Sequence, residues 1–276
     1  ADCILTEPQH SPKLAESLID ALAGVLCLPL AVGELSLRLS PDDPLDLSVH
    51  HDAGRDRVII NAGSNLTLLT ANLTGVLQLD GHGAITVSGP VHLDRGLTAA
   101  ARAFTLDPAG TIAAASATLH TTETLSLQAG RLEIDGDLTL RSGGQLTLRD
   151  QPTQPLMVTA GGDLLLQAEQ RVDIVALDHP DSALISGGDL RLRSPHPVRG
   201  DVHYFSGGVF AIEQPDGRPG QLISPHDPLV LANGDVALGD YTGASLHVLA
   251  GGSVTLGNVT ITGPDTGPNS INPGNA

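Results

Sequence analysis

Gly161-Gly162-Asp163-Leu164-Leu165-Leu166 decides the fold of this chain, because the same phrase returns along it. In each copy a glycine-bearing turn leads into a short strand in which every second side chain is apolar. A repeated turn and strand is the unit of a coil that buries its apolar side only by stacking on neighbouring coils. The other copies are Gly136-Asp137-Leu138-Thr139-Leu140, Gly143-Gly144-Gln145-Leu146-Thr147-Leu148, Gly187-Gly188-Asp189-Leu190-Arg191-Leu192, Gly234-Asp235-Val236-Ala237-Leu238 and Gly251-Gly252-Ser253-Val254-Thr255-Leu256.

The spacing of the copies indicates the kind of repeat. The step from Gly143 to Gly161 is 18 residues, and the step from Gly161 to Gly187 is 26 residues. Propeller blades need roughly 40 to 50 residues per repeat, and leucine-rich repeats carry an asparagine ladder that is missing here. Variable coils of about 20 residues, rich in turns and without helical periodicity, fit an all-β, parallel β-solenoid.

Alternation with period two predicts which side chains of each coil point inward. The turn glycines are expected at the corners, where a sharp bend favours a residue without Cβ. From Leu35 onward the same alternation predicts successive coils, including the Ala-rich stretch 99–121, where no helical stripe exists. The expected inward pairs are Leu138/Leu140, Leu146/Leu148, Leu164/Leu166, Leu190/Leu192, Val236/Leu238, Val254/Leu256 and Val259/Ile261.

Composition supports one continuous solenoid domain. A chain of 276 residues can bury a large core, yet aromatic residues make up only 2% of it, with no Trp, three Phe and two Tyr. The net charge of −17 argues against nucleic acid and anionic lipid as partners. No apolar run reaches the ~18 residues of a membrane span. The chain begins without an initiator Met or a leader, so we expect a mature, secreted or cell-surface product.

The first 32 residues are predicted to form a cap. Ser11 is a plausible N-cap with Pro12 at the first helical position, and an apolar stripe ends at Gly24. A short amphipathic helix here would cover the open end of the solenoid core. Cys3 and Cys27 either form a disulfide that holds this segment or remain two buried thiols. The expected domains are the cap, 1–32, the parallel β-helix, 33–262, and a Gly/Pro/Asn-rich tail, 263–276.

Part of the sequence resembles a known family. Ser206-Gly207-Gly208-Val209-Phe210, Glu213-Gln214-Pro215-Asp216-Gly217 and Asp240-Tyr241-Thr242-Gly243-Ala244 resemble segments of cyanobacterial filamentous-haemagglutinin-like, adhesin-type proteins. The resemblance covers about residues 186–265 and implies a right-handed parallel β-helix on the cell surface or secreted. It implies no catalytic residue. The Asn-Pro-Asn-Gly and Asn-Pro-Asn-Leu motifs of two-partner secretion are absent from the sequence.

One acidic knot is the candidate for a metal site. Asp42, Asp43 and Asp46 gather around two prolines, and several converging oxygens are what Ca²⁺ needs. The alternative is a solvated turn. No other cofactor is expected. His50 and His51 follow, but adjacent strand residues face opposite ways, so the pair is expected to be surface histidines rather than a metal grip.

Two polar and aromatic groups could contact glycans. Arg191 and Arg193 share one outward face with Asp189, and are expected either to pair with acidic side chains of adjoining coils or to line a groove that binds an anionic glycan. The aromatic group from Tyr204 to Phe210 could stack on a sugar ring or pack a loop against the solenoid flank.

The carboxyl-terminal coil carries the clearest prediction about function. Val259-Thr260-Ile261 is the last expected strand, followed by a tail without a covering helix. An uncovered last layer would expose a strand edge and apolar side chains, here Val254, Leu256, Val259 and Ile261. Repeated end-to-end contact of this kind grows a filament. We therefore expect a non-catalytic structural or adhesive protein that associates with copies of itself. The alternative is a β-helix enzyme acting on glycans, or a glycan-binding passenger.

Overall fold

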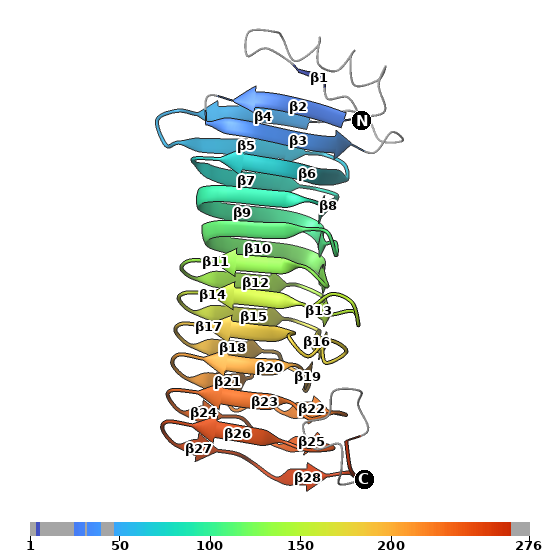
Figure 1. Cartoon of the computed structure of the whole chain (residues 1–276), viewed down its shortest axis with the longest axis vertical. Coiled ribbons are helices and arrows are strands. Elements are labelled where there is room, and N and C mark those ends of the chain that lie inside the picture. Colours follow the sequence, from blue (N-terminus) through green and yellow to red (C-terminus); the bar gives the residue numbers. More distant parts are fainter. Residues whose placement is uncertain (1–3, 6–24, 31, 40–46, 266–276) are drawn as a thin grey trace.

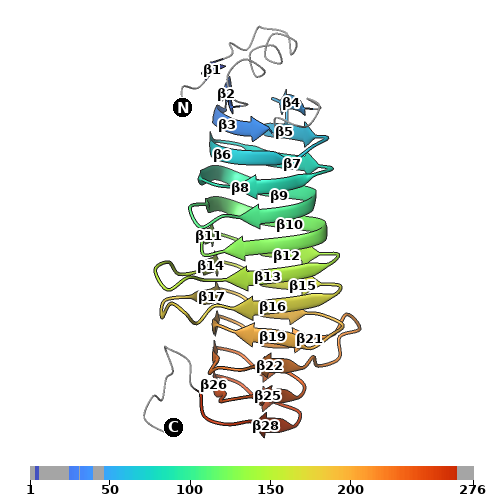
Figure 2. The same cartoon turned by 90° about the vertical axis from the view of Figure 1, so that its right-hand side faces the viewer.

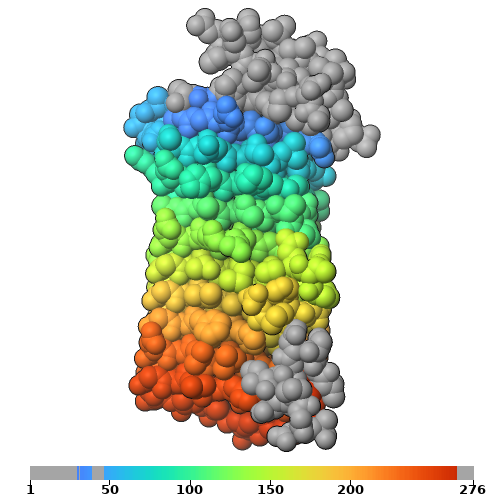
Figure 3. Space-filling view, in the orientation of Figure 1, coloured from blue at the N-terminus to red at the C-terminus, as the bar shows by residue number. Residues whose placement is uncertain are grey.

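Parallel strands stack one above another along most of this molecule and build an elongated rod whose coils follow the order of the sequence (Figures 1 and 3). The computed structural model describes residues 4–5, 25–30, 32–39 and 47–265. These residues form an all-β, parallel β-solenoid of about ten turns and contain no helix. The helix predicted after Ser11 and the tail beyond residue 265 lie outside the described residues, and the handedness of the coil stays a prediction.

From β11 onward each coil contributes one strand to each of three stacks. Figure 2 shows the strands of the third stack lying one below another. The first stack contains β11 (Arg131–Ile134), β14 (Met157–Ala160), β17 (Ala183–Ser186), β20 (His203–Ser206), β23 (Leu229–Ala232) and β26 (His247–Ala250). The second contains β12 (Leu138–Ser142), β15 (Leu164–Ala168), β18 (Leu190–Arg193), β21 (Phe210–Glu213), β24 (Val236–Ala237) and β27 (Val254–Thr255). The third contains β13 (Gln145–Arg149), β16 (Arg171–Val175), β19 (Val198–Asp201), β22 (Leu222–Ser224), β25 (Tyr241–Gly243) and β28 (Val259–Ile261).

Two long strands run across all three stacks in the upper half of the rod. They are β9 (Pro90–Leu106) and β10 (Thr111–Gln128), and β10 pairs in parallel with β11, β12 and β13 in turn. Small inward residues such as Ala114 and Ala117 are buried in the core there. The prediction that the Ala-rich stretch is strand rather than helix is confirmed.

The amino-terminal part of the described chain differs from the prediction. The parallel coil begins with β5 (Arg57–Ala62), β6 (Leu66–Leu73), β7 (Val76–Gly81) and β8 (Ala84–Val87). Before it, β3 (Gly33–Leu39) runs antiparallel to β6 and to β2 (Val25–Leu30), and β4 (Leu47–Asp52) runs antiparallel to β5. The short strand β1 (Ile4–Leu5) pairs in parallel with β2. The expected parallel coils after residue 33 are therefore wrong as far as residue 52, because alternation gives the buried face of a strand but not its direction.

The core is a set of columns of buried aliphatic side chains. Leu138, Leu164 and Leu190 occupy one column in register, and all three are fully or almost fully buried. Leu146 is also inward, but it stacks on Val172 in the third stack. The glycine phrases therefore belong to two different corners of the coil, and these two corners together with the unequal lengths of the coils explain the unequal spacing of the phrases in the sequence.

Candidate functional site

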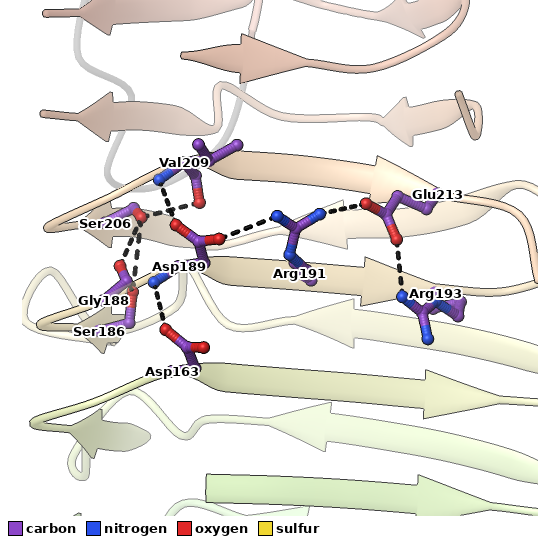
Figure 4. A network of polar contacts seen from close by, with 9 residues as sticks. All are labelled: Asp163, Ser186, Gly188, Asp189, Arg191, Arg193, Ser206, Val209 and Glu213. Carbon is purple, nitrogen blue, oxygen red and sulfur yellow. Dashed lines mark hydrogen bonds and ion pairs between the residues drawn. The ribbon is translucent and has the colours of Figure 1, made fainter. Parts of the chain in front are cut away.

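The repeated Gly-Gly-Asp phrase is a structural device of the corner between the first and second stacks. Asp163 Oδ1 accepts the backbone N–H of Asp189 at 2.8 Å, and Asp189 Oδ1 accepts that of Val209 at 2.8 Å (Figure 4). A Cβ on Gly188 would overlap Asp163 Oδ1, so glycine fits best at the position in the following coil that faces each carboxylate. The motif thus links consecutive coils, and its carboxylates are occupied by backbone donors.

An ion-pair network crosses the outer face of the second stack, as Figure 4 shows. Arg191 bridges Asp189 in its own coil, at 2.8 Å, and Glu213 in the next coil, which Arg193 also contacts at 2.8 Å. The Val209 N–H and Arg191 hold the pKa of Asp189 below its usual value. Burial opposes ionisation of Glu213, but bonds from Arg193 and Arg191 keep the pKa of its carboxyl below the usual range. The prediction that these arginines pair with acids of adjoining coils is confirmed.

A similar arrangement lies on the third stack. The Asp173 side chain is only 4% exposed, and its Oδ2 lies 3.1 Å from Arg149 and 3.0 Å from Arg171. Arg149 also donates to the Asp173 carbonyl at 2.8 Å. Arg149 therefore links its coil to the next one, Arg171 pairs within its own strand, and neither presents an unpaired cationic groove.

A buried polar corner joins the third and first stacks. Asp201 is fully buried at the end of β19, and its Oδ1 accepts the Ser224 hydroxyl and, at 3.1 Å, the backbone N–H of His226. Burial raises the pKa of the Asp201 carboxyl. Asp201 Oδ2 and the Tyr204 hydroxyl, both buried, have no hydrogen-bond partner within the described chain.

The coils below extend this corner. The Tyr241 hydroxyl donates to the Ser245 carbonyl, and burial raises the pKa of Tyr241 to about 12. His226 Nδ1 lies 3.2 Å from Asp265 Oδ1. Burial lowers the pKa of His203, which begins β20. The Asp201 carboxyl is buried, and the corner around it is a network of polar contacts between coils.

Sequence patterns did not identify this corner, because coils of unequal length separate its members. Alternation gave no signal either. It puts Asp201 in the outward register of β19, at a position that holds Val175 in the preceding coil and Arg149 in the coil before that, so an acidic residue there does not stand out. The aromatic prediction was also incomplete, since Tyr204 and Phe210 pack within the core with ring centroids 5.0 Å apart.

The remaining aromatic side chain of that group, Phe205, lines an open groove of about 570 Å³. The groove follows the edge of the first stack beside the glycine corner, and Leu231, Leu249 and Asn233 also line it. It combines apolar side chains with an exposed amide and carries no charged lining residue.

The last described turn places the four predicted end-layer residues together. Val254, Val259 and Ile261 stack below the buried Val236, Tyr241 and Gly243, yet they are 49%, 49% and 55% exposed. Leu256 is partly buried against the core. Within the described part of the chain, no strand pairs with the outer edge of β26, β27 or β28.

The other predicted sites cannot be located. Asp42, Asp43 and Asp46 lie outside the described residues, as does Cys3, and for Cys27 only the backbone in β2 is described. The calcium site and the disulfide stay predictions. Elsewhere in the chain that the structure describes, no three His, Cys, Asp or Glu side chains are placed to hold a metal ion. Nor does any helix of that part have the length and apolar character to cross a membrane.

Comparison with known proteins finds no matching family model, no matching curated protein and no matching solved structure.

Proposed function

We propose that this chain is a non-catalytic structural or adhesive protein, secreted or on the cell surface, whose solenoids associate end to end. The observation that carries the proposal is the last described turn. Its inward-type residues Val254, Val259 and Ile261 are about half exposed, whereas their equivalents one coil earlier are buried. Contact with another copy would remove this apolar surface from water.

The backbone of the same turn supports the proposal. Strands β26, β27 and β28 pair only on the side of the preceding coil among the described strands, and an unpaired parallel edge is a template for further pairing. In the coil before it, Asp235 and Asp240 accept the backbone N–H groups of Ser253 and Asn258, at 2.7 and 2.8 Å. Among the described residues, no further coil follows that could donate to Ser253 and Asn258 in the same way. The Asn258 side-chain oxygen would continue that ladder into a second molecule.

The remaining parts of the proposal rest on the sequence. The resemblance to filamentous-haemagglutinin-like proteins supports a right-handed coil and an extracellular location. The net charge of −17 keeps single rods soluble and restricts contact to surfaces without charge. The exposed end layer is such a surface, since Val254, Leu256, Val259 and Ile261 are all apolar.

The test is the mass of the purified protein in solution. Multi-angle light scattering across a range of concentrations should show species heavier than one chain, and Val259→Asp/Ile261→Asp should reduce them. Ile223→Asp is the matched control, because Ile223 is 42% exposed but lies on the outer face of the third stack. A wild-type protein that stays at the mass of one chain at high concentration contradicts end-to-end association.

A glycan-binding or glycan-acting solenoid is the second candidate, favoured by the open position of Phe205 in the groove. An aromatic ring at a surface can stack on the apolar face of a sugar. Cleavage of acidic polysaccharides in the presence of Ca²⁺, lost in Asp42→Ala or Asp43→Ala, would support the enzyme. Absence of binding and cleavage across such substrates would remove this candidate.

A further inference from the structure

The outer face of the first stack changes in character along the rod. In β11 the outward side chains Arg131 and Glu133 form an ion pair at 2.8 Å. From β17 to β26 the outward positions contain no Asp, Glu, Lys or Arg. One of the two outward columns forms an apolar ridge in register along the axis, defined by Ile185, Phe205, Leu231 and Leu249, and the other column contains His203 and His247.

The ridge is open to solvent. Leu249 is 58% exposed, the largest exposed fraction of any bulky apolar side chain that the structure describes, and the other three ridge residues are half-buried. Contiguous apolar patches of this kind on a soluble protein mark contact surfaces. The same stretch of the second stack is covered by the Arg191 network and offers no comparable patch.

A trough runs beside the ridge, toward the corner with the second stack. It is the 570 Å³ groove, in which Gly207 and Gly251 are two corner positions without side chains, and Asn233 lies at the corner position between them. A Cβ on Gly207 would overlap the Gly187 carbonyl oxygen, and one on Gly251 would overlap the Asn233 carbonyl oxygen. Close stacking of the corners therefore keeps these two positions of the trough free of side chains.

Ridge and trough lie side by side and both follow the long axis. A twofold axis parallel to the rod and placed between them brings the ridge of one molecule onto the trough of another, and the reverse contact forms at the same time. A twofold axis across the rod would instead set ridge against ridge. The surface is thus complementary to itself in one arrangement, in which two rods lie parallel.

We propose that a second copy of this chain packs laterally on this face, ridge into trough, with the two rods pointing the same way. Charge favours this occupant, because a molecule with a net charge of −17 can approach its own copy closely only through a face that lacks acidic side chains. Sheets packed face to face lie about 10 Å apart, a distance that ridge side chains of this size fill. The pairing adds to end-to-end association and does not depend on it, since the two surfaces differ.

The experiment uses Val259→Asp/Ile261→Asp as background, so that axial association does not mask lateral pairing. Sedimentation velocity or light scattering should show twice the 28.3 kDa of one chain. Adding Leu231→Asp or Leu249→Asp should convert this species to the single chain, with at least a tenfold rise in the dissociation constant. Ile223→Asp, on another face, should leave the dimer intact, and matching circular dichroism melting curves would show that all variants fold.

Three results would overturn the proposal. One is a background protein that has the mass of one chain at every concentration. Another is a dimer that Leu231→Asp and Leu249→Asp leave unchanged, or that Ile223→Asp disrupts equally. The third is binding of a neutral oligosaccharide such as cellohexaose to a single chain, lost in Leu231→Asp, which would assign the groove to a glycan. Failure of end-to-end association alone would leave the lateral dimer in place and so is distinguishable.

Discussion

The two ends of the parallel coil differ in what lies against their outermost strands. At the amino-terminal end β3 runs antiparallel along β6, and its inward side chains Leu35 and Leu37 are almost completely buried. At the carboxyl-terminal end the inward-type residues Val259 and Ile261 are about half exposed. The antiparallel strand β3 therefore covers the first parallel coil. Within the described residues, no strand lies over the last turn in the same way. Among the described residues, the parallel coil is therefore covered at its amino-terminal end and open at its carboxyl-terminal end.

The largest expected effect compares the two end layers directly. Leu37→Ala removes a fully buried side chain and should lower the free energy of unfolding by about 3 kcal/mol. Ile261→Ala removes a side chain that is 55% exposed and should cost less than about 1 kcal/mol. Urea unfolding of dilute protein, followed by circular dichroism, measures both.

Equal losses in the two variants would show that the last layer is covered in solution. Repeating the measurement at lower protein concentration then separates the causes. A cost of Ile261→Ala that falls on dilution assigns the cover to another copy, whereas a constant cost contradicts an open end.

The described core illustrates how much of the fold could be predicted. The inward positions of Leu138, Leu146 and Leu164 follow from alternation alone, because a strand that buries one face repeats with period two. The direction of β3 could not be predicted, since Leu35 and Leu37 alternate identically in either orientation. Direction depends on which hydrogen-bonding partner the edge of β6 accepts, and that is a long-range property.

The candidate sites divide in the same way. Val259 and Ile261 could be predicted as an end layer because they close the last alternating stretch of the sequence. The buried corner around Asp201 could not, because its partners Ser224 and His226 come from the following coil, across a turn of variable length. The groove beside Phe205 could not be predicted either, because the repeated glycine phrase does not indicate which of its glycines line a groove on the surface.

A matched pair of glycine substitutions sharpens the comparison of covered and open coils. Gly188 lies against the Asp163 carboxylate of the preceding coil in the middle of the rod, and Gly257 lies against the Asp240 carboxylate of the preceding coil in the last turn. In both places a Cβ would overlap the carboxylate oxygen. Gly188→Ala should cost about 2 kcal/mol, because coils on both sides prevent relaxation. Gly257→Ala should cost clearly less, because the last turn can move outward.

Thermal melting of the two variants tests this difference. Gly54→Ala is the control, since a Cβ there meets only the Asp52 carboxylate, at 3.4 Å, and should be tolerated. Equal destabilisation by Gly188→Ala and Gly257→Ala would indicate that the last turn is as confined as the middle of the rod.

The buried corner near the open end predicts a dependence on pH. Burial raises the pKa of Asp201 above the usual aspartate value of 3.8, so the folded protein binds this proton more tightly than the unfolded chain. The contribution of Asp201 to stability is therefore fully present below the unfolded pKa and is lost as the pH rises through the folded pKa. Asp201→Asn keeps an acceptor for Ser224 and His226 and should remove this decline.

The measurement is the free energy of unfolding of both proteins from pH 3 to pH 8. Their difference should grow in favour of Asp201→Asn as the pH rises, and then level off. A difference that is constant over the whole range would show that Asp201 has the same pKa in the folded and unfolded chain. Ser224→Ala provides a second check, because it removes a bond to the carboxylate and should enlarge the pH-dependent decline.

The smallest expected effect concerns how ion pairs hold successive coils together. Arg191 joins its own coil to the next through Glu213, whereas Arg131 pairs with Glu133 within one strand. Arg191→Gln should therefore lower the free energy of unfolding by about 1 kcal/mol at low ionic strength. Arg131→Gln should lower it by less, because the Arg131 and Glu133 side chains are both about half exposed. Added salt should shrink the first cost, because it screens the charges. A double-mutant cycle of Arg191→Gln with Glu213→Gln isolates the contact between coils. A coupling energy of zero would mean that these coils are held in register only by backbone pairing and by the bonds from backbone N–H groups to Asp163 and Asp189. The difference between the covered and the open end would then come entirely from apolar contacts.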